Sequence, residues 1–261
     1  MSFEIDLTQV FECGQCFRFS PYKGGYHGVA YGKYIEVFVE NGKVASIVDD
    51  DFISDFLDLN RDYSVIGKAL SEDIVIKKAL EYSSGIRILK QEPWETLCSF
   101  IISQNNNIPR IKKIIASLCD CYGDSIEGTD MKSFPSAATV AALTKEEIDV
   151  IRSGFRGKYI SDAATRVANG EINLDTVRKM CYYDAKRELK KIKGVGDKVA
   201  DCVLLFGLGF YEAFPIDVWV KRVLEKYYSD PEKPFSPEKF GKYAGIAQQY
   251  LFYYERSINK K

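Results

Sequence analysis

The alternation of apolar and polar positions changes character near residue 50. Within residues 25–50, β-branched and aromatic residues alternate with polar residues and are interrupted by glycines, a pattern typical of β-strands. Asn41-Gly42 lies between the segments VFVE and KVASIV, where it predicts a tight hairpin turn. We therefore interpret residues 1 to about 50 as an antiparallel β region.

From about residue 51 onward, apolar residues recur at spacings of three and four, as they do on one face of an amphipathic helix. Ser136, Thr144 and Ser236 are candidate N-caps, and Pro237 would occupy the first helical position after Ser236. A small β region followed by a mostly helical remainder predicts the α+β class. The expected helical stretches are residues 53–59, 63–84, 94–104, 108–123, 136–144, 145–153, 157–169, 183–192, 198–209, 216–228 and 236–257.

The composition is that of an ordinary globular protein, with 46% hydrophobic and 28% charged residues in a chain of 261. No apolar run reaches membrane-spanning length, and the N-terminus lacks the charged and apolar regions of a secretion signal. These features predict an intracellular protein that makes no contact with a membrane.

The cysteines and the single histidine narrow the possible chemistry. Seven irregularly spaced cysteines argue against a disulfide framework, and the pair Cys13 and Cys16 has no second pair to complete a zinc site. Any Ser–His–Asp triad or Cys–His pair would have to use His27. We therefore expect no metal and no cofactor, and catalytic groups drawn from Lys, Asp, Glu, Cys or Tyr.

A local cluster of basic residues outweighs the overall charge as a guide to partners. The formal net charge is −1, which by itself argues weakly against nucleic acid. Residues 186–198, KRELKKIKGVGDK, contain six basic and two acidic residues. The pattern predicts a helix ending near Ile192, a turn at Gly194-Val195-Gly196, and a second helix from about Asp197. Such a hairpin can point backbone N–H groups at a phosphate, and we expect its glycines to supply positive φ and close backbone approach.

Lys198 in this hairpin and Asp217, nineteen residues later, form a candidate catalytic pair. Breaking an N-glycosidic bond builds positive charge on the sugar, which a fixed carboxylate stabilises. A neutral amine can attack C1′ and form a Schiff base, from which β-elimination cleaves the strand. A free lysine has a pKa near 10.4, so Lys198 would need a lower pKa, through burial or nearby positive charge.

Six ordered blocks resemble the 8-oxoguanine DNA glycosylases of the helix-hairpin-helix/Gly-Pro-Asp superfamily, and together they cover essentially the whole chain. The blocks are GQCFRF at 14–19, FIISQNNNIPRI at 100–111, GFRGKYI at 154–160, GVGDKVADC at 194–202, PIDVWV at 215–220 and FGKYAGIAQQYLF at 240–252. The resemblance implies an N-terminal antiparallel β domain at residues 1–82 and a helical helix-hairpin-helix catalytic domain at residues 83–261.

The resemblance also implies a function. It suggests a bifunctional DNA glycosylase/AP lyase of base excision repair, which removes 8-oxoguanine, preferentially opposite cytosine, through a lysine Schiff base and β-elimination. The partner would be double-stranded DNA containing 8-oxoguanine, with the protein associated with the cytoplasmic nucleoid if the source is prokaryotic. No apolar stripe indicates a dimer, so we expect a monomer.

The resemblance assigns roles to individual residues. Lys198 matches the nucleophile and Asp217 the catalytic aspartate, while the Gly14 carbonyl would accept the N7 proton that 8-oxoguanine carries and guanine lacks. Phe155 matches an aromatic wedge that is often tyrosine, and Trp219 replaces a histidine found in many members, so any imidazole contact is in doubt. The implied base-binding residues are Gly14, Cys202, Pro215, Gln248 and Phe252, and the implied DNA or opposite-base contacts are Asn105, Arg110, Phe155, Arg156, Gly194, Gly196 and Trp219.

Other interpretations stay open at this point. Asp217 could be only a helix N-cap, Gly14 a strand bulge, and Cys202 and Phe252 core residues. A glycosylase for alkylated bases would use the aspartate and water alone, and such enzymes typically lack the lysine of GVGDK. A helix-hairpin-helix module that only binds DNA would need the basic hairpin but not Asp217, Gln248, Phe252 or Gly14.

Overall fold

The computed structural model describes residues 3–259 and begins with a short helix followed by a four-stranded antiparallel sheet. The strands are β1 (Ser20–Tyr22), β2 (Gly25–Ala30), β3 (Lys33–Glu40) and β4 (Lys43–Ser46), paired in sequence order. Glu40 pairs with Lys43, and Asn41 and Gly42 between them both have positive φ, which confirms the predicted hairpin turn.

Helix α1 (Leu7–Glu12) corrects our interpretation of residues 1–50 as strands. The side chain of Asp6 caps it by accepting a hydrogen bond from the Gln9 N–H. Leu7, Val10 and Phe11 are buried, and their spacing of three and four is that of a helix. Six residues span less than two helical turns, which is too short for a helical period to stand out in the sequence beside the strand pattern that follows.

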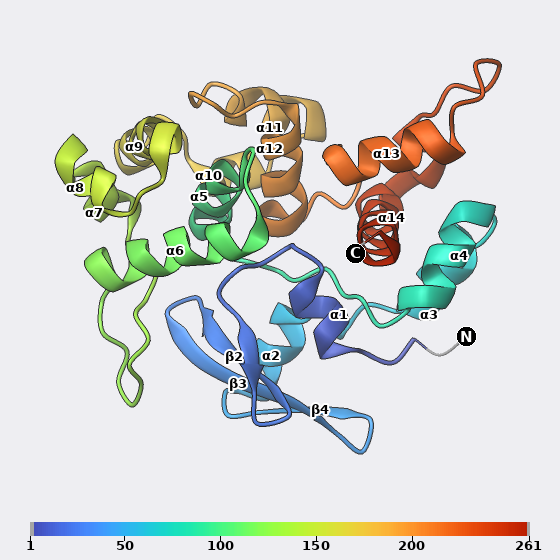
Figure 1. The fold of residues 1–261 in the computed structure, drawn as a ribbon, viewed down its shortest axis with the longest axis horizontal. Helices are drawn as coiled ribbons and strands as arrows, with labels where there is room; N and C mark the ends of the chain where they lie inside the picture. The colour runs from blue at the N-terminus through green and yellow to red at the C-terminus, as the bar shows by residue number, and fades with distance from the viewer. Residues whose placement is uncertain (1–2, 260–261) are drawn as a thin grey trace.

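The rest of the described chain is mostly helical, as predicted, and the α+β class is confirmed (Figure 1). Ser136, Thr144 and Ser236 cap their helices as expected. The helices are α2 (Asp50–Phe56), α3 (Tyr63–Leu70), α4 (Ile74–Ser83), α5 (Pro93–Ser103), α6 (Ile108–Tyr122), α7 (Ala137–Ala141), α8 (Lys145–Val150), α9 (Gly157–Ala168), α10 (Leu174–Arg178), α11 (Tyr182–Leu189), α12 (Asp197–Val203), α13 (Val218–Tyr227) and α14 (Ala244–Ile258), with 3₁₀ turns at Gly154–Arg156 and Pro237–Tyr243 and a π-helical turn at Leu204–Leu208.

Several predicted helical stretches differ from the observed helices. The stretch 63–84 is divided, because Asp73 leaves the helical conformation and caps α4. The stretch 236–257 is broken at Gly241, whose φ of 53° no right-handed helix accommodates. Helix α10 was not predicted, since five residues are too few to display a helical period.

Two clusters of buried side chains hold the described residues together. The smaller cluster joins α1, the sheet, α2 and Leu89. The larger cluster joins the helices and includes Tyr63 of α3 and Leu80 of α4. In Figure 1 the sheet lies below the helices, with α1 between them, and α14 packs against α4 and α13. The division into domains at residues 1–82 and 83–261 stays a prediction.

In the part of the chain that the structure describes, no helix is both long and apolar enough to cross a membrane.

Candidate active site

A cavity between the α1–β1 segment and the helices gathers every residue that the sequence placed in catalysis or base binding. Lys198 and Cys202 come from α12, Gln248 and Phe252 from α14, and Asp217 from the start of α13. The remaining lining residues are Gly14, Phe17, Phe100, Ser103, Asn106, Ile108, Ile111, Phe206, Pro215, Trp219 and Gln249.

Lys198 lies in the first turn of α12 with its amine held over an apolar surface. Its Nζ donates a hydrogen bond of 3.1 Å to Ser103 Oγ and lies 5.0 Å from the centre of the Phe100 ring. Within residues 3–259 no carboxylate forms an ion pair with it. The amine therefore faces the cavity without a counter-charge bonded to it.

Asp217 is the N-cap of α13, as the sequence allowed. Its Oδ1 accepts hydrogen bonds from the N–H groups of Trp219 (3.0 Å) and Val220 (2.9 Å). Oδ2 receives no hydrogen bond from any described residue. Burial raises the pKa of this carboxyl group, and the two backbone donors and Lys198 oppose that shift. One oxygen is thus fixed by the helix while the other is left for the cavity.

Gly14 lies in a bend after α1, not in a strand, so the strand-bulge alternative does not apply. Its φ is +79°, a conformation that favours glycine. A Cβ here would lie 3.3 Å from Cε1 of Phe252. No described residue donates a hydrogen bond to its carbonyl oxygen. The position therefore favours glycine, and its carbonyl is a backbone acceptor without a partner among the described residues.

Gln248 and Cys202 contribute a polar and an apolar wall. Gln248 is 4% exposed, and its Oε1 has no hydrogen-bond partner among the described residues. A buried acceptor without a partner costs free energy unless a ligand supplies a donor. Burial raises the pKa of the Cys202 thiol to about 12, so it remains neutral and presents an apolar group to the cavity.

The predicted helix-hairpin-helix is present, formed by α11, a turn and α12, but its two glycines differ. Gly194 has φ +81°, which confirms the expected positive φ, and a Cβ there would lie 2.4 Å from Cδ2 of Tyr159. The expected close approach to a phosphate stays a prediction. Gly196 has φ −94°, which corrects the expectation of positive φ, and a Cβ there would meet nothing within 4 Å. The tight turn is completed at Gly194 alone, because Gly196 already has the extended conformation of an N-cap.

The hairpin lysines are less available than their number suggests. Lys190 pairs with Asp197 at 2.9 Å, Lys191 with Glu188 at 2.7 Å, and Lys193 lies 3.8 Å from an oxygen of Asp162. No described residue accepts a hydrogen bond from the backbone N–H of Gly194 or Gly196. The hairpin therefore offers a phosphate chiefly backbone N–H groups.

The residues matched to opposite-base reading lie outside the cavity lining, near the α5–α6 loop and the turn before α9. Phe155 is 50% exposed, as a wedge requires. Arg156 is 3% exposed and donates hydrogen bonds to the carbonyls of Gln104, Asn105 and Ser153. Arg156 therefore fixes the backbone of the loop that carries Asn105.

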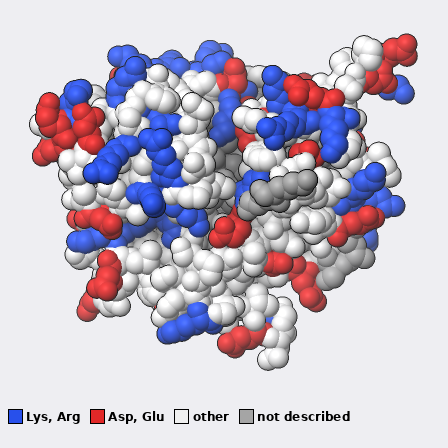
Figure 2. All heavy atoms as spheres, in the orientation of Figure 1, with Lys and Arg blue, Asp and Glu red and all other residues white. Residues whose placement is uncertain are grey.

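Arg110 and Trp219 complete the predicted set. Arg110 is exposed in the first turn of α6. Burial lowers the pKa of Arg156, and the nearby charge of Arg110 lowers it further. Trp219 lines the cavity, and the guanidinium of Arg222 lies 4.7 Å from the centre of its ring. Figure 2 shows Lys and Arg side chains gathered over α6, α9 and α13, with fewer over the sheet.

Several lining residues were not singled out from the sequence. Ser103, the hydrogen-bond partner of Lys198, and Asn106 both lie within the FIISQNNNIPRI block. Gln249 directly follows Gln248 in the FGKYAGIAQQYLF block, and two adjacent glutamines between apolar residues were the available signal. Position within a motif block could therefore have identified all three.

Two family models match successive parts of the chain. One, described as 8-oxoguanine DNA glycosylase, N-terminal domain, matches residues 2–97. The other, described as HhH-GPD superfamily base excision DNA repair protein, matches residues 98–243.

Curated relatives and solved structures agree with these models. The N-glycosylase/DNA lyase of Saccharomyces cerevisiae is 40% identical over 158 residues, which are 55% of this chain but only 42% of the yeast protein. The N-glycosylase/DNA lyase OGG1 of Arabidopsis thaliana is 29% identical over 98% of this chain and 79% of its own length. The Clostridium acetobutylicum 8-oxoguanine glycosylase/lyase, solved with double-stranded DNA containing cytosine opposite 8-oxoguanine, has a TM-score of 0.91 and 39% identity over 98% of this chain and 93% of its own. This chain therefore belongs to the helix-hairpin-helix/Gly-Pro-Asp superfamily of base excision DNA repair proteins and, within it, to the 8-oxoguanine DNA glycosylases.

Proposed function

We propose that the protein is a bifunctional DNA glycosylase/AP lyase that excises 8-oxoguanine from double-stranded DNA, preferentially opposite cytosine, by way of a Schiff base on Lys198. The observation that carries this proposal is the convergence of Lys198 and Asp217 in a cavity that also presents the unpartnered Gln248 Oε1. A module that only binds DNA has no use for this set of groups.

The two catalytic groups suit the two parts of the reaction. The neutral amine of Lys198 attacks C1′ as the C1′–N9 bond breaks, and the new C1′–Nζ ammonium gives up a proton that the departing base takes at N9. Asp217 stabilises the positive charge that develops on the sugar. Ring opening then leaves an imine between C1′ and Nζ, and loss of a C2′ proton expels the 3′ phosphate. Because no ion pair joins Lys198 and Asp217 in the described residues, both groups are free to act on a sugar placed between them.

The walls of the cavity suit a flipped 8-oxoguanine. Gln248 Oε1 is an acceptor for the N–H groups of the Watson–Crick edge, and the Gly14 carbonyl is an acceptor for N7–H. Guanine would present a lone pair to that carbonyl, which costs free energy. Cys202, Pro215 and Phe252 would contact the base itself, and their contacts offset the cost of flipping.

The surroundings of the cavity suit a duplex. Phe155 would fill the space left by the flipped base, and Asn105, Arg110 and Arg156 would contact the cytosine. The hairpin N–H groups and the exposed basic side chains would hold the backbone. We further propose that the protein acts as a monomer, inside the cell, without membrane contact.

The test is borohydride trapping on a labelled duplex with one 8-oxoguanine opposite cytosine, beside guanine·cytosine and 8-oxoguanine·adenine duplexes. Borohydride reduces the imine to a stable amine, so we expect a covalent adduct that is strongest on the 8-oxoguanine·cytosine duplex. Lys198→Gln should abolish the adduct. Lys191→Gln, which changes a lysine of the same hairpin, should keep it.

Each other outcome has a meaning. An alkali-labile abasic site without an adduct would indicate excision by water and would favour the mechanism of the alkylated-base glycosylases, with Asp217 retained and Lys198 demoted. If neither an adduct nor an abasic site forms, the remaining interpretation is a module that only binds DNA. Equal adducts opposite cytosine and adenine would remove only the opposite-base preference.

A further inference from the structure

The backbone on both sides of Gly14 is held by glutamine side chains. Nε2 of Gln249, from α14, donates a hydrogen bond of 2.8 Å to the carbonyl of Cys13. Nε2 of Gln91 donates a hydrogen bond of 2.8 Å to the carbonyl of Gln15. Among residues 3–259 the Gly14 carbonyl receives no such bond, although its residue lines the cavity. The one unused acceptor in this run thus belongs to the residue beside the cavity.

The side chain of Gln15 is a second anchor, from the opposite direction. It is fully buried, and its Nε2 donates to the carbonyls of Val10 (2.9 Å) and Arg87 (2.8 Å). Its Oε1 accepts a hydrogen bond of 2.9 Å from the Leu89 N–H. Gln15 therefore ties the peptide group that carries the Gly14 carbonyl to the linker between α4 and α5.

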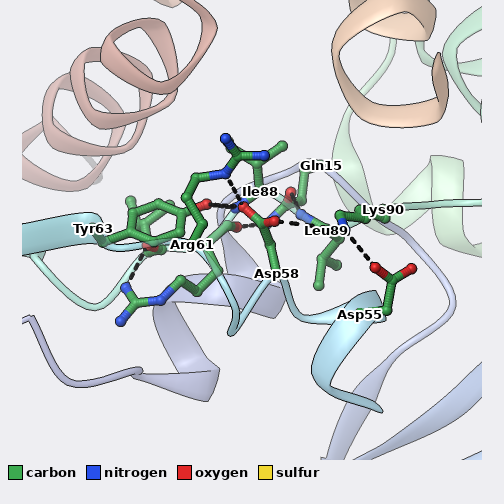
Figure 3. Close-up of polar contacts among 10 residues, drawn as sticks. Gln15, Asp55, Asp58, Arg61, Tyr63, Ile88, Leu89 and Lys90 are labelled. Carbon is green, nitrogen blue, oxygen red and sulfur yellow. Dashed lines mark hydrogen bonds and ion pairs between the residues drawn. The ribbon is translucent and has the colours of Figure 1, made fainter. Parts of the chain in front are cut away.

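That linker is itself fixed by a polar network, drawn in Figure 3. The Ile88 N–H donates to Tyr63 Oη at 2.8 Å, and Tyr63 Oη donates to Asp58 Oδ2 at 2.9 Å. Arg61 Nε donates to the same oxygen at 2.6 Å. Because Asp58 is only 2% exposed and bonded from two sides, the linker has little freedom to move away from Gln15.

Helix α14 carries both substrate-facing and loop-holding residues. Gln248, Gln249 and Phe252 line the cavity, and Gln249 and Arg256 also bond the loop, Arg256 by donating to the Glu12 carbonyl at 2.5 Å. Gln249 is 2% exposed, so its hydrogen bond does not compete with water. The spacing between the Gln248 amide and the Gly14 carbonyl is therefore determined by one helix and one short hydrogen bond.

We propose that Gln249 and Gln15 are positioning residues that fix the Gly14 carbonyl in the cavity and so set the preference for a base bearing N7–H over guanine. The inference rests on the proposed function, because it supposes that Gly14 faces the flipped base. An acceptor that could swing away would bind the lesion less well and would tolerate guanine better. Two anchors at adjacent peptide groups prevent that motion.

The test compares Gln249→Leu with Gln9→Leu. Gln9 is the control, because its side chain also joins segments distant in the sequence, by accepting a part-buried hydrogen bond from the Gly85 N–H, but forms no hydrogen bond to residues 13–15. Binding is measured to three cytosine-containing duplexes: 2′-fluoro-8-oxoguanine, 2′-fluoroguanine, and an abasic tetrahydrofuran site. The fluorine slows cleavage, so that dissociation constants can be measured with Lys198 intact.

We expect Gln249→Leu to lower the preference for 8-oxoguanine over guanine about ten-fold, the upper range for one hydrogen bond. Binding to the abasic site, which has no base to read, should be unchanged. Gln9→Leu should keep the wild-type ratio on all three duplexes. Gln249→Asn, which stays polar but is too short to reach Cys13, should match Gln249→Leu and replaces it if the leucine variant does not fold.

The remaining outcomes overturn one idea or the other. An unchanged preference in folded Gln249 variants, or an equal loss on the abasic duplex, would overturn the positioning role while leaving the proposed function intact. A wild-type protein that fails to prefer 8-oxoguanine would overturn the proposed function, and the positioning role with it.

Discussion

Asp217 shows, at the scale of a single residue, how a catalytic group can reduce the stability of the fold. Burial raises the pKa of its carboxyl group, so the ionised form is less favourable in the folded protein than in the unfolded chain. The ionised carboxylate therefore destabilises the fold at neutral pH, and this cost disappears as the pH falls below the pKa of an unfolded aspartate.

We expect Asp217→Asn to lower the rate of base excision about 100-fold or more, as for loss of one transition-state contact. The same change should raise the free energy of unfolding at pH 7 and leave it nearly unchanged near pH 3, below the pKa of an unfolded aspartate. Asparagine keeps the oxygen that accepts from Trp219 and Val220. Single-turnover excision and urea denaturation at the two pH values measure both effects.

Asp62 provides the control, because it caps α3 through the N–H groups of Ser64 and Val65 in the same arrangement. Its hydrogen bonds to Ser64 and Val65 lower its pKa. The ionised Asp62 carboxylate therefore stabilises the fold at neutral pH, and this stabilisation is lost as the pH falls. Asp62→Asn should destabilise the protein at pH 7. A destabilised Asp217→Asn at that pH would contradict our account of the buried carboxylate.

A second residue-scale prediction concerns Gly14. Gly14→Ala should cost about 1 kcal/mol of stability through its positive φ, and it should also reduce 8-oxoguanine excision because the new methyl group crowds Phe252. Gly24→Ala is the matched control, because Gly24 also has a positive φ, +83°, but no atom lies within 4 Å of the added Cβ. It should show the loss of stability without the loss of excision, as thermal melts and excision rates would reveal.

The residues of the cavity were largely predictable, whereas their local states were not. Lys198, Asp217, Gln248 and the other base-pocket residues lie in motif blocks, and all of them line one cavity. The engagement of Arg156 with the Gln104 and Asn105 carbonyls depends on a loop 51 or 52 residues away in the sequence. No local pattern encodes such a contact.

At the scale of elements, most helices fall in predicted stretches, whereas the short helices α1 and α10 were missed. Helices α5, α6, α9 and α14 each complete several turns and display their period in the sequence. Helices α1 and α10 complete fewer than two turns, so tertiary packing and caps decide their conformation. The conformation of Gly196 was likewise decided by its position as an N-cap.

The hairpin allows stability and DNA binding to be separated. Gly196→Ala should leave the free energy of unfolding within about 0.5 kcal/mol of wild type, because its φ is negative and the space is open. It should nevertheless weaken binding to the duplex, since the methyl group stands where a phosphate would approach. Gly194→Ala should instead destabilise the fold through Tyr159. Unchanged affinity in Gly196→Ala would mean that the hairpin does not contact the phosphate.

At the scale of the whole molecule, a nearly neutral chain gathers Lys and Arg side chains over α6, α9 and α13 on the face that Figure 2 shows, with acidic side chains among them. Acidic partners on the hairpin moderate that face, with Asp197 paired to Lys190 and lying 3.6 Å from Lys186. Binding to DNA should therefore weaken with salt less steeply than the number of lysines suggests.

Asp197→Asn should release these lysines and tighten duplex binding several-fold at low salt, with the slope of log K against log salt steeper by about one. Asp50→Asn, which removes a carboxylate from α2 in the β region, should leave the slope unchanged. Titrations at several salt concentrations measure both. An unaltered slope in Asp197→Asn would show that these lysines do not meet phosphate.

The position of the cavity between α1 and α14 has a consequence for synthesis of the protein. One wall comes from residues 14 and 17 and another from residues 248 and 252, so the ribosome must translate nearly all of this sequence before the two can meet. A nascent chain thus carries Lys198 and Asp217 before the cavity around them can close. A prematurely terminated product that ends before residue 248 would lack one wall of that cavity.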